Sequence, residues 1–286
     1  MFSQHHTITM DTLQQLLTSY AYNILGSYEE AKDVVQDVML ERLKRDADVI
    51  ENEKAYLTRS AINRAINAKN RQKKIRSSYP GEWLPEPVAT ERADHELHQK
   101  DILSYSLMVL LEKLDARQRA VFILKEAFDY EHEEIAEVLR ISVENSRKIL
   151  SRAKKELRTE SANNIVEVPR DYLDNYIEII HNGDTEKLEQ LLSDDIVLVS
   201  DGGGKAAAAI HPLVGKEPAF MFLSGIYRKF YQNSRIEKGF VNHNPALFFY
   251  VANDLVTCQV LELKDEKIHR IYFLRNPDKL ASLQTM

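Results

Sequence analysis

Over the first 160 residues, hydrophobic side chains recur every three or four positions, which is the spacing of amphipathic helices. The pattern is clearest in Glu133–Arg158, which predicts a helix, a tight turn at Ile141-Ser142 and a second helix. Ser142 is the predicted N-cap of the second helix, because its hydroxyl can accept from an orphan amide of the first turn. The predicted buried face of that helix is Ser146, Ile149, Leu150, Ala153 and Leu157.

The opposite face of this second helix is polar and mostly cationic. With the cap, its candidate DNA contacts are Ser142, Glu144, Asn145, Arg147, Lys148, Ser151, Arg152 and Lys155. Long cations reach phosphates and guanine edges, and short polar groups near the N-terminus reach bases. The pattern favours a helix-turn-helix that reads a major groove. The alternative is an ordinary amphipathic helix with a solvated basic face.

A helix is also predicted over residues 28–45, with a stripe of alanine, valine and methionine on its core side. Its other side is acidic but contains a leucine: the residues are Asp33, Gln36, Asp37, Leu40 and Glu41. Such a face could dock a basic partner helix. A solvated face with one stray leucine explains the pattern equally well.

The next predicted helix, residues 54–76, is strongly cationic. From Arg59 to Arg76 it has seven basic residues and no acidic one, in a chain whose net charge is −6. Its candidate nucleic-acid contacts are Tyr56, Arg59, Asn63, Arg64, Asn67, Asn70, Arg71 and Lys74. Asparagine can bond base edges, cations neutralise phosphates, and a tyrosine can stack on an unpaired base. The alternatives are a solvated charge run and a tyrosine that belongs to the core.

Residues 77–90 interrupt the helical pattern with three prolines, a glycine and the only tryptophan. This composition predicts an extended linker. Trp83 and Leu84 would each gain a few kcal/mol on burial, so we expect the linker to dock on another part of the chain. The alternative is that Trp83 merely seals the end of the first helical domain.

Composition adds limits on compartment and chemistry. One cysteine, Cys258, excludes an internal disulfide and suits a reducing interior. The N-terminus lacks the features of a signal peptide, and no hydrophobic run approaches the roughly 20 residues that span a bilayer. We therefore expect a soluble, cytoplasmic protein that does not contact a membrane. The scattered histidines suggest no metal site, and no cofactor is predicted.

The last third of the chain has a mixed pattern. Helices are predicted over 171–181, 185–192 and 218–231, and strands over 195–200, 241–251, 255–263 and 267–274. Two helices, a strand, a helix and an antiparallel meander give an α+β domain.

The blocks SYEEAKDVVQDVMLERL, KAYLTRSAINRAINAKNRQKK and LEKLDARQRAVFILKEAFDYEHEEIAEVLRISVENSRKILSRAKKELR resemble regions 2 and 4 of bacterial sigma factors of the extracytoplasmic-function type. The resemblance covers almost all of residues 8–158. It implies that the face at Asp33–Glu41 grips the clamp helices of the RNA polymerase β′ subunit and that region 4 meets the β flap. It also implies that the helix with Asn63, Asn67 and Arg71 recognises and opens the −10 promoter element.

In the same resemblance, the helix 143–157 reads the −35 element. This chain departs from the family here, because many members have a valine-lysine-serine-arginine run where it has Ser146-Arg147-Lys148-Ile149. The −35 sequence of the commonest members should therefore not be transferred. The expected organisation is a region 2 domain (1–76), a linker (77–98), a region 4 domain (99–160) and a C-terminal domain (169–286).

The C-terminal domain resembles the SnoaL-like, cone-shaped fold, whose curved sheet encloses a pocket. Three motifs are similar to signatures of group 41 of these sigma factors, in which the appended domain acts as a built-in regulator instead of a separate anti-sigma factor. They are Trp83-Leu84-Pro85-Glu86-Pro87, Asp201-Gly202-Gly203-Gly204-Lys205 and Asn276-Pro277-Asp278-Lys279-Leu280. Glycines permit close approach of another segment, and Asp201 and Lys205 could form charge pairs. Otherwise the glycine motif is a strand-end loop and the last motif a turn with a helix cap.

The fold class also includes enzymes, so the alternative function is a sigma factor whose C-terminal domain is a ligand sensor or an enzyme of the isomerase or cyclase type. The catalytic candidates are Asp201, Asp254, His211 and His269. Their spacing forms no recognisable catalytic set, so we expect no enzyme. A small ligand in the C-terminal pocket is the partner that this alternative adds.

Overall fold

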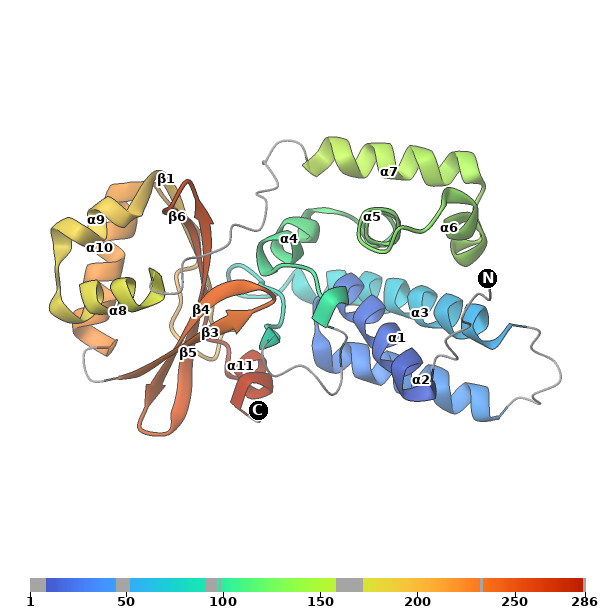
Figure 1. Cartoon of the computed structure of the whole chain (residues 1–286), viewed down its shortest axis with the longest axis horizontal. Coiled ribbons are helices and arrows are strands. Elements are labelled where there is room, and N and C mark those ends of the chain that lie inside the picture. Colours follow the sequence, from blue (N-terminus) through green and yellow to red (C-terminus); the bar gives the residue numbers. More distant parts are fainter. Residues whose placement is uncertain are drawn as a thin grey trace, which may run out of the picture. The chain divides into compact units, whose positions relative to one another are not determined.

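The computed structural model of the chain describes residues 9–44, 52–90, 97, 99–157, 172–231 and 234–284 (Figure 1). These residues group into two units. Unit 1 contains those within Met1–Lys74, Ala93–Leu103 and Leu110–Ser161, and unit 2 those within Ile75–Arg92, Ser104–Val109 and Ala162–Met286. Most of the expected linker thus belongs with the C-terminal unit. Its positions 91–96 and 98, and the expected domain start at 169, lie outside the described residues.

Unit 1 is helical in its described residues, as the pattern predicts. Its main helices are α1 (Met10–Leu25), α2 (Tyr28–Leu43), α3 (Glu53–Arg76, whose last two residues join unit 2), α5 (Ala116–Glu126), α6 (His132–Leu139) and α7 (Val143–Leu157). The last two form the predicted helix-turn-helix, and all five residues of the predicted buried face of α7 are buried.

Side-chain caps decide where several of these helices begin. Ser142 accepts from the amide of Asn145 at 3.1 Å, which confirms the predicted cap of α7. Asp115 and Gln118 form a reciprocal capping box at the start of α5. Arg140 ends α6 in the left-handed region at φ 53°. A left-handed residue at a helix end is usually a glycine, so the arginine at this position did not signal the end of the helix.

Unit 2 is built on a six-stranded sheet in the order β2-β1-β6-β5-β4-β3. The strands are β1 (Leu192–Asp201), β2 (Leu213–Val214), β3 (Arg235–Val241), β4 (Asn244–Val251), β5 (Asp254–Lys264) and β6 (Lys267–Leu274). β1 pairs parallel with β6, and the other neighbours are antiparallel.

The sheet corrects two details of the sequence prediction. The predicted strand over 241–251 is in fact the end of β3, a turn and β4. Asn242 and His243 form that turn with φ of 46° and 63°, conformations that suit a two-residue hairpin. β3 itself was not predicted, because its charged and half-exposed residues lie on a sheet edge and lack clean alternation.

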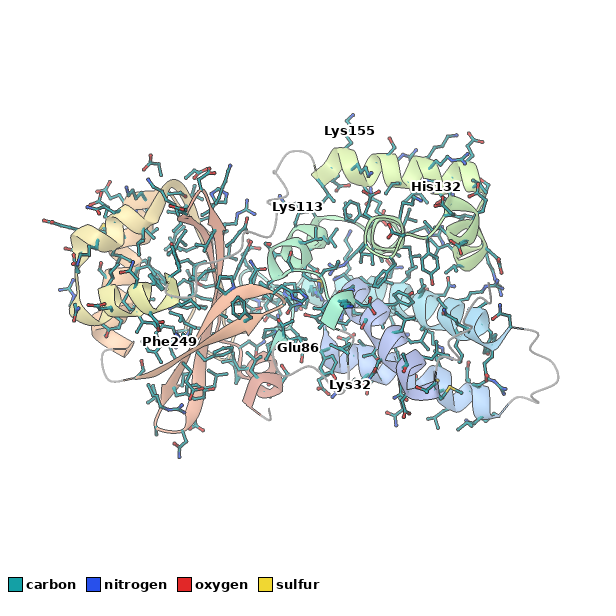
Figure 2. All side chains as sticks on the ribbon, viewed as in Figure 1. Lys32, Glu86, Lys113, His132, Lys155 and Phe249 are labelled. Atoms are coloured by element: carbon teal, nitrogen blue, oxygen red, sulfur yellow. The ribbon has the colours of Figure 1, made fainter. Side chains whose placement is uncertain are left out.

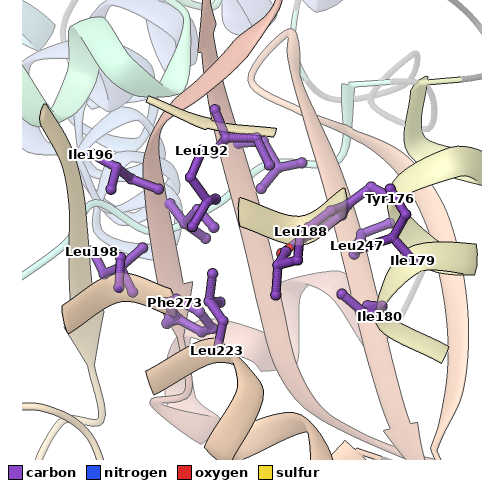
Figure 3. Close-up of a cluster of buried hydrophobic side chains, with 14 of the residues drawn as sticks. Tyr176, Ile179, Ile180, Leu188, Leu192, Ile196, Leu198, Leu223, Leu247 and Phe273 are labelled. Atoms are coloured by element: carbon purple, nitrogen blue, oxygen red, sulfur yellow. The ribbon is translucent and has the colours of Figure 1, made fainter. Parts of the chain in front are cut away.

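Both faces of this sheet are covered. α8 (Tyr172–Asn182), α9 (Thr185–Leu191) and α10 (Lys216–Ile226) pack on one face around a hydrophobic core that includes Leu188, Leu223 and Phe249 (Figures 1 and 3). The linker, the short helix α4 (Tyr105–Leu110) and α11 (Pro277–Gln284) supply the second core, which contains Leu84 and Tyr105. The α+β class of this domain is confirmed.

The described helices include none that combines the length and hydrophobicity needed to cross a bilayer.

Candidate functional site

The N-cap Ser142 and the solvent face of α7 together present all eight residues predicted to contact the −35 element. Every one of them is exposed, and Figure 2 shows Lys155 pointing away from the neighbouring helices of unit 1. His132 at the start of α6 lies against the buried Ser146, with 2.9 Å between Nδ1 and Oγ. This contact helps to fix the angle between the two helices, so that the cationic face of α7 remains available to a partner.

Two cations on this face have acidic neighbours. Arg147 lies 3.4 Å from Glu133, and Lys148 lies 2.6 Å from Glu144, with all four side chains more than half exposed. Exposed pairs of this kind contribute only about 0–1 kcal/mol. DNA phosphates could therefore replace the carboxylates at little cost.

The predicted −10 face of α3 divides into two groups. Asn67, Asn70, Arg71 and Lys74 are exposed, whereas Tyr56, Arg59, Asn63 and Arg64 are half-buried. The half-buried asparagine and arginines are held by other parts of unit 1. Asn63 Nδ2 donates to the Val138 carbonyl of α6 at 2.8 Å, and Arg59 pairs with Glu137 on the same helix. Region 4 thus contacts the middle of the predicted DNA-reading face of region 2.

The predicted polymerase face of α2 is exposed at all five positions, and the side chain of Leu40 is 48% accessible to solvent. Arg64 of α3 reaches this face and binds Glu41 at 2.5 Å and Asp37 at 3.6 Å. One predicted −10 residue therefore neutralises part of the acidic surface.

A buried charge cluster, which the sequence did not reveal, joins α3 to the helices of region 4. Lys69 lies within 2.7 and 2.8 Å of the two oxygens of Glu112, and Arg119 pairs with the same carboxylate. Both cations also donate to carbonyls at the end of α1, Lys69 to Leu25 at 2.9 Å and Arg119 to Asn23 at 2.8 Å. The end of a helix favours cations because its last carbonyls are unpaired. Lys69 was counted within a cationic run, but it is a core residue.

In unit 2 the three group 41 motifs meet at the carboxylate of Asp201, which is fully buried. Its Oδ1 accepts from the Tyr79 hydroxyl at 2.5 Å and from the Gly203 amide at 3.0 Å. Its Oδ2 accepts from the Leu84 amide at 2.9 Å and from Lys279 Nζ at 2.6 Å. A buried carboxylate needs such complete pairing. We call these residues the Asp201 cluster; it fastens the linker to the C-terminal domain.

Tyr79 is a member of this cluster that sequence reasoning missed, because a single tyrosine before a proline carries no signal. Burial, reinforced by the hydrogen bond to Asp201, raises the pKa of Tyr79 well above its ordinary value. The hydroxyl therefore keeps its proton and donates. Asn276 Nδ2 donates in turn to the Tyr79 oxygen at 3.1 Å.

Trp83 packs against two cations, with Arg76 Cζ 3.1 Å and Lys279 Nζ 4.0 Å from its ring centroid. Cations are attracted to the face of an indole ring. Leu84, Pro85, Glu86 and Pro87 are all buried, and Lys279 also donates to the Leu84 carbonyl. The expected docking of the linker is therefore observed within unit 2.

Steric constraints explain why the second motif contains glycines. Gly203 and Gly204 have φ of 62° and 71°, and a Cβ at those positions would collide with Asn276 and Pro80 respectively. Gly202 is buried against the Ala206 carbonyl. Lys205 does not join Asp201; its partner is Asp278, at 2.5 Å. Pro277 begins α11 and Leu280 is part of the second core.

Further contacts extend the docked linker past the motif. Val88 and Asn242 exchange two hydrogen bonds of 2.9 Å, one through the Asn242 side chain. The Tyr105 hydroxyl donates to the Pro85 carbonyl at 2.8 Å, and its amide donates to Asn244 Oδ1 at 2.9 Å. The first turn of α4 is thus bound to the C-terminal domain as well.

The four candidate catalytic residues do not form one site. Asp201 is buried under the linker, His269 lies 3.2 Å from Asp195, and His211 and Asp254 are exposed. In the part of the chain that the structure describes, no hydrogen bond or ion pair joins any two of them. The geometry gives the enzyme alternative no support.

Comparisons with known proteins assign two of the domains. Residues 9–75 match sigma-70 region 2, and residues 104–157 match sigma-70 region 4. The chain is 29% identical over 230 residues to the extracytoplasmic-function RNA polymerase sigma factor SigJ of Mycobacterium tuberculosis, covering 77% of this chain and 72% of that protein.

The crystal structure of SigJ from the same organism is similar over almost the whole chain. It matches with a TM-score of 0.76 at 25% identity, covering 95% of this chain and 97% of that one. A second relative from that organism, which is 22% identical over 188 residues and covers 63% of this chain and 64% of the relative, is the probable extracytoplasmic-function RNA polymerase sigma factor SigI. Regions 2 and 4, followed by the α+β domain, identify this chain as a sigma factor of the extracytoplasmic-function type.

Proposed function

We propose that this sigma factor directs core RNA polymerase to specific promoters and that its C-terminal domain controls this activity within the same chain. The observation that carries the second part is the Asp201 cluster. It holds the linker that follows region 2 through two hydrogen bonds, from the Tyr79 hydroxyl and the Leu84 amide, to one buried carboxylate that Gly203 and Lys279 also bind. Because such a linker sets how far regions 2 and 4 can separate, the domain that binds it can control promoter binding.

Three surfaces carry the proposed contacts. The exposed face of α7 reads the −35 element, the face of α3 binds the −10 element, and the acidic face of α2 with Leu40 binds the polymerase clamp. The exposure of all the α2 and α7 candidates supports these roles. The resemblance to group 41 supports control without a separate anti-sigma factor.

The free chain is proposed to be closed on the −10 side. Arg59 and Asn63 contact α6, so they become available to single-stranded DNA only when α6 leaves α3. The exposed residues Asn67, Asn70 and Arg71 can make a first contact before that step. Promoter melting would then follow the separation of regions 2 and 4.

The direct test is in-vitro transcription with purified core enzyme, comparing the full chain with a chain that ends at residue 165. We expect the full chain to give a promoter-specific start. Removal of the C-terminal domain should change promoter activity and shift the emission of Trp83 to longer wavelength, because the linker loses its binding site. No specific start with the full chain would refute the sigma role. Unchanged emission and activity after truncation would refute only the control.

Replacing Arg147 or Lys148 with alanine should weaken binding to promoter DNA by about 1–3 kcal/mol if the side chain contacts a base. The loss should be largest on DNA with an intact −35 element, as measured by fluorescence anisotropy. Lys187→Ala is the matched control, because that exposed lysine lies on α9 and pairs with Asp184. Unchanged affinity for the α7 variants would remove them from the reading face.

A further inference from the structure

A cavity of about 290 Å³ lies among the three helices that cover the sheet of unit 2. Its walls come from α8 (Ile179 and Ile180), α9 (Leu188) and α10 (Leu223). These four side chains are also members of the hydrophobic core and are 4–7% exposed. Figure 3 labels these four side chains on the helices that cover the sheet. The core is therefore incompletely filled on its helical side.

Ser224 adds a polar atom to this hydrophobic wall. A helical serine commonly satisfies its hydroxyl with the carbonyl four residues earlier. Ser224 Oγ is inaccessible to solvent and has no hydrogen-bond partner among the described residues. Buried hydroxyls are nearly always hydrogen-bonded, so rotation of this side chain toward the cavity, where a ligand would accept, satisfies the hydroxyl.

The charges around the cavity favour an anion. Arg228 lines it, is exposed and forms no ion pair with any described residue. The acidic residue of the wall, Asp184, is already engaged: it caps α9 by accepting from the Lys187 amide and pairs with the Lys187 side chain, both at 3.1 Å. The available charge at the cavity is thus positive.

We infer that this cavity binds a small hydrophobic monocarboxylate. The hydrocarbon body would occupy the space between Ile180, Leu188 and Leu223. The carboxylate would accept from Arg228 and, once the Ser224 side chain has rotated toward the cavity, from Ser224 Oγ. A volume near the lower end of known ligand sites fits such a compact molecule. The inference goes beyond the sigma function, and binding requires neither DNA nor polymerase.

Isothermal titration of the full chain with decanoate, below its micelle concentration, tests the site. We expect saturable binding of one decanoate, and about tenfold weaker binding of decanol, which keeps the body but lacks the charge. Arg228→Met should weaken the binding of decanoate about tenfold and leave the binding of decanol unchanged. Lys229→Met is the matched control, because the neighbouring cation is not part of the wall.

Two variants locate the binding. Leu188→Phe fills the cavity and should abolish binding of both compounds, with far-UV circular dichroism confirming the fold. Thr185 lines the cavity from an exposed position. Thr185→Tyr should therefore obstruct the cavity and weaken the binding of both compounds while leaving the buried core unchanged. The inference is overturned if the binding of decanoate does not saturate or if both blocking variants bind decanoate normally. It is also overturned if Lys229→Met and Arg228→Met change the affinity for decanoate equally.

Discussion

Replacing Asp201 with asparagine is expected to destabilise the docked linker by about 3–5 kcal/mol, because it removes the buried carboxylate that pairs with the buried ammonium of Lys279. The amide keeps the shape of the side chain, so the change removes mainly charge. Trp83, the only tryptophan, lies against Lys279 and reports on this region. In urea unfolding followed by its fluorescence, the midpoint should fall by more than about 1 M.

Lys205→Met provides the matched control. It removes a charge from the same glycine motif, but the pair with Asp278 is more than half exposed on both sides and contributes about 0–1 kcal/mol. Its midpoint should stay within a few tenths of a molar of the parent. Equal shifts in the two variants would show that Asp201 is not the residue that fastens the linker.

Replacing Glu112 with glutamine should destabilise unit 1 by a similar amount. Lys69 and Arg119 are 8% and 0% exposed, and both form ion pairs with this carboxylate. Loss of one partner of a buried charge cluster costs about 3–5 kcal/mol. The melting temperature of unit 1 should therefore fall by about 10 °C. Hydrogen exchange, measured by mass spectrometry, should accelerate in α3 and α5.

The comparison for this variant is Glu137→Gln. Glu137 also joins region 4 to α3, through Arg59, but its side chain is 69% exposed. We expect a loss below about 1 kcal/mol and nearly unchanged exchange in α5. Exchange in β5 and β6 should be unaffected by either substitution. A Glu112 variant as stable as Glu137→Gln would contradict the structural role of the buried cluster.

These two clusters hold different parts of the chain together, so we expect them to affect activity in different ways. The Asp201 cluster acts on the linker within unit 2, and the Glu112 cluster holds regions 2 and 4 together within unit 1. In the proposed mechanism, opening unit 1 would free Arg59 and Asn63 of α3 from α6 and make them available to DNA. Glu112 is a suitable element for such a transition, because Lys69 of region 2 loses this carboxylate when the regions separate, whereas Arg119 of region 4 keeps it.

Local patterns predicted the elements that depend on local rules. The spacing of Ile149, Leu150 and Ala153 identified the buried face of α7, and Ser142 identified its first turn. The edge strand β3 was missed because solvent, and not a core, covers much of its surface. The turn at Asn242 was missed because its hydrogen bonds are made to Val88, far away in sequence.

The sequence by itself determined the helix-turn-helix, the acidic and cationic helix faces and the α+β class of the last domain, since periodicity and capping act within a few residues. Only the tertiary structure decided the partners of buried charges. Lys69 and Arg71 look alike in a cationic run, yet one is in the core and the other in solvent. Likewise, Asp201 could have paired with Lys205 but binds Lys279 and Tyr79, because long-range packing determines which charges are buried together.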